Sequence, residues 1–287
     1  IINQEFISLK YSIRKMKLSI CKKLSNNKTM SKERPLILIT NDDGYEAKGL
    51  ASLIEAAAPF GEIVVITTDT PRSGNAHAIT MSTPLRINQY KQYDNVTIYR
   101  TNGTPVDCVK LGQRVVLRDR KIDLVLSGIN HGSNSSVSLI YSGTMAAAIE
   151  ASFENTPAIG FSLLDYAADA DFSGAKMVVS KMIENVLRDG LPDFTCLNVN
   201  IPAIPAEEIK GMKVTRQTMG YWYEDLHENI DTFGRKYYWL SGYLKNTDES
   251  PEGTCEWALQ NNYVSIQPVQ FDMTAHKHIK DLKKWEE

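Results

Sequence analysis

The chain has 287 residues, of which 43% are hydrophobic and 23% are charged, as is usual for a soluble globular enzyme with one large or two small domains. Its formal net charge of −2 gives no basic excess to neutralise a nucleic-acid backbone, which argues against polymeric nucleic acid as a partner. No apolar run approaches the roughly 18 residues of a membrane helix, so we expect no membrane association.

The cysteines indicate the cellular compartment, and residues 1–30 indicate where the folded part of the chain begins. Four scattered cysteines without CxxC spacing predict reduced thiols in a cytoplasmic protein, with Cys108 and Cys196 buried. Residues 1–30 begin with Ile, are rich in Lys, Ser and Asn, and lack the features of a signal peptide. We expect them to be a non-native or disordered extension before a start at Met30; a targeting or binding tail is the alternative.

The next residues alternate short β-rich runs with a helical stretch. The run LILIT (36–40), a helix over about 47–58 and the run EIVVITT (62–68) form a βαβ unit, which implies parallel strands. Two alternating runs, 83–90 and 95–101, predict an antiparallel excursion.

Thr104 and Pro105 are typical of an N-cap and a first helical position, and predict a helix that continues to about Leu117. Further alternation follows, as strand 122–128, helix 142–153, strand 157–164, helix 173–188 and strand 196–202. This pattern predicts an α/β catalytic core over 35–204, a doubly wound, Rossmann-like and mostly parallel sheet whose carboxyl-end loops form the site.

Residues 205–287 change in character. The segments 214–226, 236–244 and 263–273 are aromatic and β-prone, without new α/β alternation. They predict an antiparallel C-terminal extension that covers the sheet or serves as an oligomerisation arm; plain packing explains them as well.

Asn41-Asp42-Asp43-Gly44 directly follows the first predicted strand. Two adjacent carboxylates repel each other and lose hydration on burial, so a cation or hydrogen-bond donors must neutralise them. A helix N-cap with a solvated turn is the alternative interpretation.

Two further loops begin at the ends of predicted strands. Ser73 can complete a hard oxygen shell around Mg²⁺ or Mn²⁺, Arg72 can pair with phosphate oxygens, and His77 is more typical of a loop hydrogen bond than of a catalyst. After the strand at 122–128, Asn130 offers a carbonyl oxygen to a cation, although a turn rich in Gly and Asn can be a turn alone.

Tyr141-Ser142-Gly143-Thr144 precedes the Ala-rich helix. Free backbone N–H groups, the helix dipole and two hydroxyls make such an N-terminus a candidate phosphate cradle. Close helix packing also explains the glycine. All four segments are expected at one edge of one sheet.

Four ordered motifs together resemble the SurE family of stationary-phase survival nucleotidases. They are ILITNDDGYEAKGL (37–50), PRSG (71–74), NGTPVDCVKLG (102–112) and SGINHGSN…YSGTMAAAIEA (127–151), with a weaker likeness at YVSIQPVQFDMT (263–274). The resemblance covers about 35–161, and more weakly extends to about 274.

The resemblance implies one divalent ion per subunit, Mg²⁺ or Mn²⁺, held by Asp42, Asp43, Ser73 and Asn130. It implies hydrolysis of nucleoside 5′- and 3′-monophosphates, sometimes with activity on short polyphosphate. It also implies homodimers or homotetramers that exchange C-terminal arms. The predicted phosphate- and substrate-binding residues are Asn41, Gly44, Arg72, Gly74, Asn134, Ser142, Gly143 and Thr144. Ser136 and Ser138 stand where many members have Gly and Asp, which puts a supporting hydrogen bond in doubt.

In the predicted mechanism, Asp42 and Asp43 act through the ion, which activates a water to attack phosphorus; Asp43 acting partly as a base is the alternative. A phosphatase with an aspartyl-phosphate intermediate would place Asn41 at the nucleophile position, where an amide cannot serve. A non-catalytic nucleotide-binding or assembly protein is the alternative from another class, although neither GxGxxG after the first strand nor GxxxxGK[ST] occurs.

Overall fold

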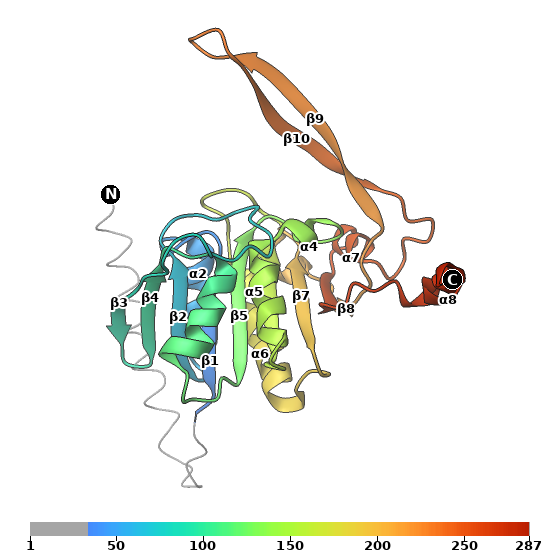
Figure 1. Cartoon of the computed structure of the whole chain (residues 1–287). Coiled ribbons are helices and arrows are strands. Elements are labelled where there is room, and N and C mark those ends of the chain that lie inside the picture. The colour runs from blue at the N-terminus through green and yellow to red at the C-terminus, as the bar shows by residue number, and fades with distance from the viewer. Residues whose placement is uncertain (1–33, 287) are drawn as a thin grey trace. The chain divides into compact units, whose positions relative to one another are not determined.

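The computed structural model describes residues 34–286. The predictions for residues 1–30 therefore fall outside the described residues. Within the described part, nine strands form one sheet (Figure 1). Their spatial order is β3 (Ile87–Tyr93), β4 (Val96–Thr101), β2 (Glu62–Thr68), β1 (Leu36–Thr40), β5 (Leu124–His131), β6 (Ala158–Leu163), β7 (Thr195–Ile201), β11 (Val264–Gln270) and β8 (Met212–Val214).

The centre of this sheet is parallel and its flanks are antiparallel. The strands from β4 through β7 pair in parallel with their neighbours. Strand β3 runs antiparallel to β4, and β11 runs antiparallel to β7. The predicted fold class, a mostly parallel α/β sheet with an antiparallel C-terminal extension, is confirmed.

Helices cover both faces because side chains alternate between the faces along each strand. Ile37 and Ile39 of β1 belong to the apolar cluster that contains α2 (Lys48–Ala57) and α6 (Ser173–Asp189). The neighbouring Leu36 and Leu38 belong to the opposite cluster, with α3 (Pro105–Leu111) and α5 (Gly143–Ser152). Strands buried on both faces explain the continuous apolar runs in the sequence.

The helix expected from Thr104 to about Leu117 changes form partway. Thr104 and Asp107 form a capping box at the start of α3, which confirms the predicted N-cap. After Leu111 the chain continues as a π-helix, Gly112–Val116. A Cβ at Gly112 would lie 2.6 Å from Leu38 Cδ2, so a larger residue here would force the Leu38 side chain to move.

Two loop boundaries differ from the prediction. The strand expected over 83–90 begins at Ile87, after Pro84, whose nitrogen cannot donate to a ladder. The connection expected between the strand that was predicted to end at 128 and the helix predicted from 142 is shorter, since β5 continues through His131 and a short helix, α4 (Ser138–Tyr141), precedes α5.

The C-terminal region supplies both sheet strands and a separate hairpin. Strands β9 (Gly220–Ile230) and β10 (Lys236–Asn246) form an antiparallel ladder of their own, which projects away from the main sheet (Figure 1). The strand expected over 214–226 is thus divided between β8 and β9. Thr254 caps a helix that the sequence reading missed, α7 (Cys255–Gln260).

The remaining elements are short. They are the 3₁₀ turns Ala206–Glu208, His276–His278 and Lys283–Trp285, and α8 (Ile279–Leu282). None of the helices described here is long and apolar enough to span a membrane.

Candidate metal and phosphate site

The predicted site segments meet at the carboxyl edge, the edge formed by the C-terminal ends of β1, β2, β5 and β6. Strand β1 lies between β2 and β5, and all three are parallel. The turn after β1, the loop after β2 and the loop after β5 therefore emerge together, as expected for an open α/β sheet.

The turn after β1 is fixed by Asn41. Its Nδ2 donates to the carbonyl oxygen of Gly44 at 2.9 Å, and its Oδ1 accepts from Thr67 Oγ1 at 2.6 Å. Gly44 has a φ of +89°, which side chains rarely tolerate. Asn41 and Gly44 thus shape the turn that presents Asp42 and Asp43, while their predicted contact with substrate stays a prediction.

Asp42 lies directly against the N-terminus of α5. It is 3% exposed, and Thr144 Oγ1 donates to its Oδ1 at 2.6 Å. A Cβ on Gly143 would lie 3.0 Å from Asp42 Oδ2, so glycine permits this approach. Burial, followed by the charge of Asp43, raises the pKa of Asp42 to about 6.

Asp43 is less buried, yet one of its oxygens lacks a partner. Its Oδ2 is buried and accepts no hydrogen bond from any described residue. Burial raises the pKa of Asp43, against the opposing influence of His131. Two adjacent desolvated carboxylates with an unsatisfied oxygen fit a divalent cation, which prefers hard oxygen ligands.

Asn130 presents its amide to the same edge. Its Nδ2 donates to the carbonyl oxygens of His131 and Gly132, at 3.2 and 2.8 Å. The nitrogen is thereby held by the backbone, and Oδ1 remains available as an oxygen ligand. Among the residues described, no three or more His, Cys, Asp or Glu side chains are grouped to hold a metal, so the candidate set depends on the neutral oxygens of Ser73 and Asn130.

The loop after β2 is joined to the turn by its backbone. Arg72 N donates to the carbonyl oxygen of Asp42 at 2.7 Å, so the loop that contains Ser73 is joined to the turn that carries the carboxylates, while a metal contact of Ser73 stays a prediction. Ser73 is exposed, and Gly74 has a φ of +75° with open space around it. Further along, His77 Nε2 lies 2.9 Å from Glu150 Oε2 of α5, so His77 does make a loop hydrogen bond.

Arg72 also has an uncommitted donor. Its Nη2 donates to the carbonyl oxygen of Asn102 at 3.0 Å and lies 3.5 Å from Asp69 Oδ1. Its Nε is buried and has no hydrogen-bond partner in the described chain. A buried guanidinium donor without a partner fits an anion such as phosphate.

The hydroxyls of the predicted phosphate cradle have different roles. Ser142 Oγ caps α5 by accepting from Met145 N at 3.0 Å, which leaves its own proton free to donate. Thr144 gives its proton to Asp42 and so positions the carboxylate. The first N–H groups of α5 have no partner within the helix, which makes this end favourable for an anion.

Asn134, predicted to contact substrate, is anchored inside the protein. Its Nδ2 donates to Ser162 Oγ at 2.8 Å, and its backbone N–H donates to Asn200 Oδ1 at 2.9 Å. Its carbonyl oxygen accepts from Asn198 at 2.8 Å. These bonds hold the loop that follows Asn130; a substrate contact of Asn134 stays a prediction.

The sequence reading missed the residues that hold this loop from the other side. Ser136 N donates to Cys255 Sγ at 3.3 Å, and Ser136 Oγ donates to the carbonyl oxygen of Thr218 at 2.8 Å. Ser135 Oγ also bonds Glu256. Thr218 and α7 come from distant parts of the sequence, and only the N-cap pattern at Thr254 could have indicated α7.

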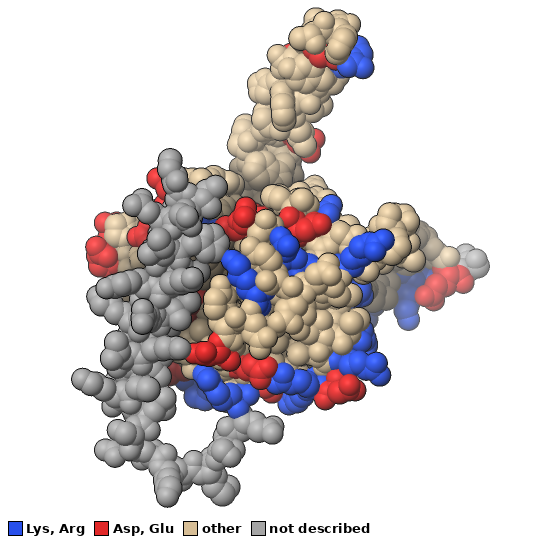
Figure 2. Space-filling view, turned by 90° about the vertical axis from the view of Figure 1, so that its left-hand side faces the viewer, with Lys and Arg blue, Asp and Glu red and all other residues tan. Residues whose placement is uncertain are grey.

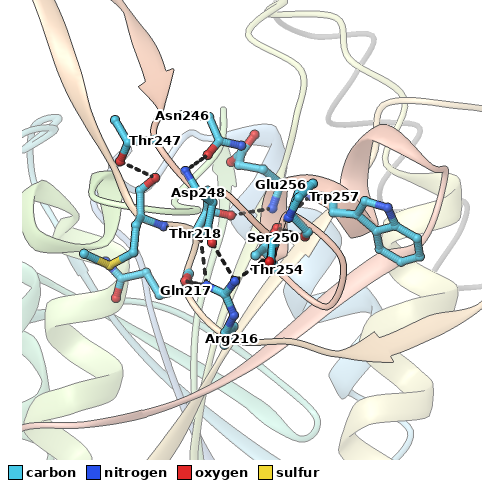
Figure 3. A network of polar contacts seen from close by, with 12 residues as sticks. Arg216, Gln217, Thr218, Asn246, Thr247, Asp248, Ser250, Thr254, Glu256 and Trp257 are labelled. Carbon is cyan, nitrogen blue, oxygen red and sulfur yellow. Dashed lines mark hydrogen bonds and ion pairs between the residues drawn. The ribbon is translucent and has the colours of Figure 1, made fainter.

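An ion pair fixes the base of the hairpin beside this contact (Figure 3). Arg216 donates from Nη1 and Nη2 to the two carboxylate oxygens of Asp248, at 2.8 and 2.6 Å. The Arg216 side chain lowers the pKa of Asp248 to about 2.

Ser138, the second residue that departs from the family pattern, accepts from Trp222 Nε1 at 3.2 Å. Both serines that depart from the pattern, Ser136 and Ser138, therefore make hydrogen bonds.

Comparison with known proteins shows similarity along most of the chain. The family model for survival protein SurE matches residues 37–224. The 5′-nucleotidase SurE of Christiangramia forsetii is 50% identical over 258 residues, which are 89% of this chain and 98% of that protein. The protein of the same name from Chlorobaculum tepidum is 40% identical over 257 residues, 90% of this chain and 97% of that one.

A solved structure shows the same fold. The crystal structure of the SurE protein from Aquifex aeolicus has a TM-score of 0.76 and 39% sequence identity to this chain. The alignment covers 88% of this chain and all of that one, at 100%.

Proposed function

Because the chain belongs to the survival protein SurE family, we propose that it is a 5′-nucleotidase that hydrolyses nucleoside 5′-monophosphates to nucleoside and phosphate. The observation that supports this activity best is the pair of desolvated carboxylates, Asp42 and Asp43, beside the N-terminus of α5. The proposed cation ligands and anion donors would then act together at the carboxyl edge, as metal-assisted phosphate chemistry requires.

Four residues would hold one Mg²⁺ or Mn²⁺: Asp42, Asp43, Ser73 and Asn130. When bound, the ion supplies positive charge for the phosphoryl oxygens and lowers the pKa of a water molecule. The unpartnered Asp43 Oδ2 supports a role as a ligand; a partial role for Asp43 as a base toward the attacking water is the alternative.

The residues around α5 would bind and orient the phosphate. The N–H groups of Gly143 and Thr144, the free proton of Ser142 and the buried Nε of Arg72 are available donors. The Thr144 hydroxyl would keep Asp42 in place during the reaction. Gly74 contributes an open backbone position in the adjacent loop.

Phosphate release from AMP, GMP and 3′-AMP tests this function, with Mn²⁺ or Mg²⁺ and again with EDTA. We expect metal-dependent release from AMP and GMP, and from 3′-AMP as well, and the three rates rank the substrates. Nucleotide binding without release under any metal would instead favour the non-catalytic nucleotide-binding alternative. Short polyphosphate, a further substrate that the family resemblance implies, is assayed in the same way.

We also propose a homodimer or homotetramer that uses the β9–β10 hairpin. Trp239, Leu240 and Tyr243 of β10 are 65%, 66% and 60% exposed, and Figure 2 shows few charged side chains on the hairpin face in view. A large exposed apolar surface indicates a protein interface.

The three cysteines in the described chain are free and buried, which supports a reducing cytoplasmic location.

A further inference from the structure

Tyr166 presents an aromatic side chain to solvent at the carboxyl edge. It follows β6, which pairs with β5, the strand that carries Asn130. The residue is 76% exposed, and its hydroxyl has no hydrogen-bond partner among the residues described. An exposed large aromatic side chain beside a candidate site can bind a ligand.

One side of the Tyr166 ring packs on the backbone of Gly132. A Cβ at Gly132 would lie 2.2 Å from Cε1 and 2.6 Å from Cζ of that ring, so only glycine permits the contact. The carbonyl oxygen of Gly132 in turn accepts from Asn130 Nδ2 at 2.8 Å. The ring therefore lies against the short segment that holds the candidate metal ligand Asn130.

The turn that carries Tyr166 is fixed by hydrogen bonds on both sides. Leu164 N donates to the carbonyl oxygen of Ile201 at 2.9 Å. Ala167 N donates to Asp165 Oδ1, also at 2.9 Å. These bonds order the backbone on both sides of Tyr166, and the ring contacts Gly132 on one side, so less conformational freedom is lost when a ligand stacks on it.

We propose that Tyr166 is a substrate-binding residue on which the nucleobase of the nucleoside monophosphate stacks. The inference rests on the proposed function, since the phosphate must first lie between Asn130 and the α5 N-terminus. Stacking on an aromatic ring favours every base because each base has a π-face. The protein should therefore accept purine and pyrimidine nucleotides with small differences in KM.

Other aromatic residues near the edge fit this role less well. Tyr45 already packs edge-to-face on Tyr90, with ring centroids 5.3 Å apart, and Arg100 lies 4.6 Å from the Tyr45 centroid. Tyr141 is 52% exposed and immediately precedes Ser142. Tyr141 is therefore the comparison residue in the test.

The test compares a substrate that has a base with a ligand that has none. KM for AMP and the inhibition constant for inorganic phosphate are measured in the metal-loaded wild type, Tyr166→Ala and Tyr166→Phe. We expect Tyr166→Ala to raise KM for AMP about tenfold, the size of a stacking contribution, with the phosphate constant unchanged. Tyr166→Phe, which keeps the ring, should behave as the wild type, and so should Tyr93→Ala at the far edge strand.

Three outcomes would overturn the proposal. They are an unchanged KM for AMP in Tyr166→Ala, an equal weakening for AMP and phosphate, as loss of loop support would give, and a tenfold effect of Tyr141→Ala alone. Absence of phosphate release by the wild type would instead reject the proposed function. A titration with adenosine, followed by fluorescence, then decides the stacking separately: weaker binding to Tyr166→Ala supports it, and equal binding contradicts it.

Discussion

Asp42 lies in surroundings that penalise its negative charge. Its pKa is raised to about 6 in the folded chain, whereas an unfolded aspartate titrates near 3.9. The ionised carboxylate therefore destabilises the metal-free fold, by up to about 3 kcal/mol at 1.36 kcal/mol per pKa unit. This cost develops as the pH rises from about 4 through 6 and is absent in more acidic solution.

Removing the charge should therefore stabilise the metal-free protein. We expect Asp42→Asn, in EDTA, to melt at a higher temperature than the wild type at pH 8, and at the same temperature at pH 4. Calorimetry at both pH values measures this. The exposed Asp119→Asn serves as the control and should change neither value. A lower melting temperature for Asp42→Asn at pH 8 would contradict the electrostatic argument.

At the scale of single residues, the sequence predicted which residue types lie in the site better than it predicted their hydrogen-bond partners. The adjacent carboxylates and the glycine-rich strand ends were recognisable because they follow apolar runs. The different roles of Ser142, which caps α5, and Thr144, which donates to Asp42, could not be recognised from the sequence. They depend on the approach of α5 to Asp42, and Thr144 is 102 residues from Asp42 in the sequence. The role of Asn134 depends likewise on Ser162, Asn198 and Asn200.

At the scale of elements, the loop between β5 and α5 depends on a buried sulfur. Cys255 Sγ accepts from Ser136 N and from Thr218 N, both at 3.3 Å. It is fully buried, so without it two backbone N–H groups lose their acceptor. Each buried unsatisfied group costs about 1–3 kcal/mol.

We expect Cys255→Ala to lower the free energy of unfolding by roughly 2–4 kcal/mol. Cys255→Ser, which keeps an acceptor, should lose less than half as much. Urea unfolding of the two variants measures the difference. Equal losses in the two variants would mean that the volume of the Cys255 side chain, and not its hydrogen bonds, stabilises the fold.

Periodicity predicted the central elements well, because strands buried on both faces and amphipathic helices have strong local signals. It failed where tertiary contacts decide the local conformation. The change to a π-helix after Leu111 accompanies the contact of Gly112 with Leu38, and β8 exists because it pairs with β11. Neither partner is near in sequence.

On the scale of the whole molecule, the β9–β10 hairpin exposes several aromatic side chains, among them Tyr223, Trp239 and Tyr243. If it forms the proposed interface between subunits, lysines on its apolar positions should prevent association. We expect the double variant Trp239→Lys and Leu240→Lys to have a smaller mass by light scattering than the wild type. Met177→Lys on α6, where Met177 is 55% exposed, is the matched control. An unchanged mass would show that the hairpin is not the interface.

The sequence predicted an antiparallel extension in this region because its segments are aromatic and β-prone and show no new α/β alternation. It did not predict that β11 enters the main sheet beside β7. That position requires the chain to return from the hairpin through α7, and long-range returns leave no local signal in sequence.

The central claim is that Asp42 and Asp43 hold the divalent ion of a nucleotidase. A Mn²⁺ titration followed by electron paramagnetic resonance tests it most directly, on the wild type, Asp43→Asn and the control Asp119→Asn. We predict one bound Mn²⁺ per chain in the wild type and in Asp119→Asn, with binding at least tenfold weaker in Asp43→Asn. Equal Mn²⁺ binding by all three proteins would contradict the claim.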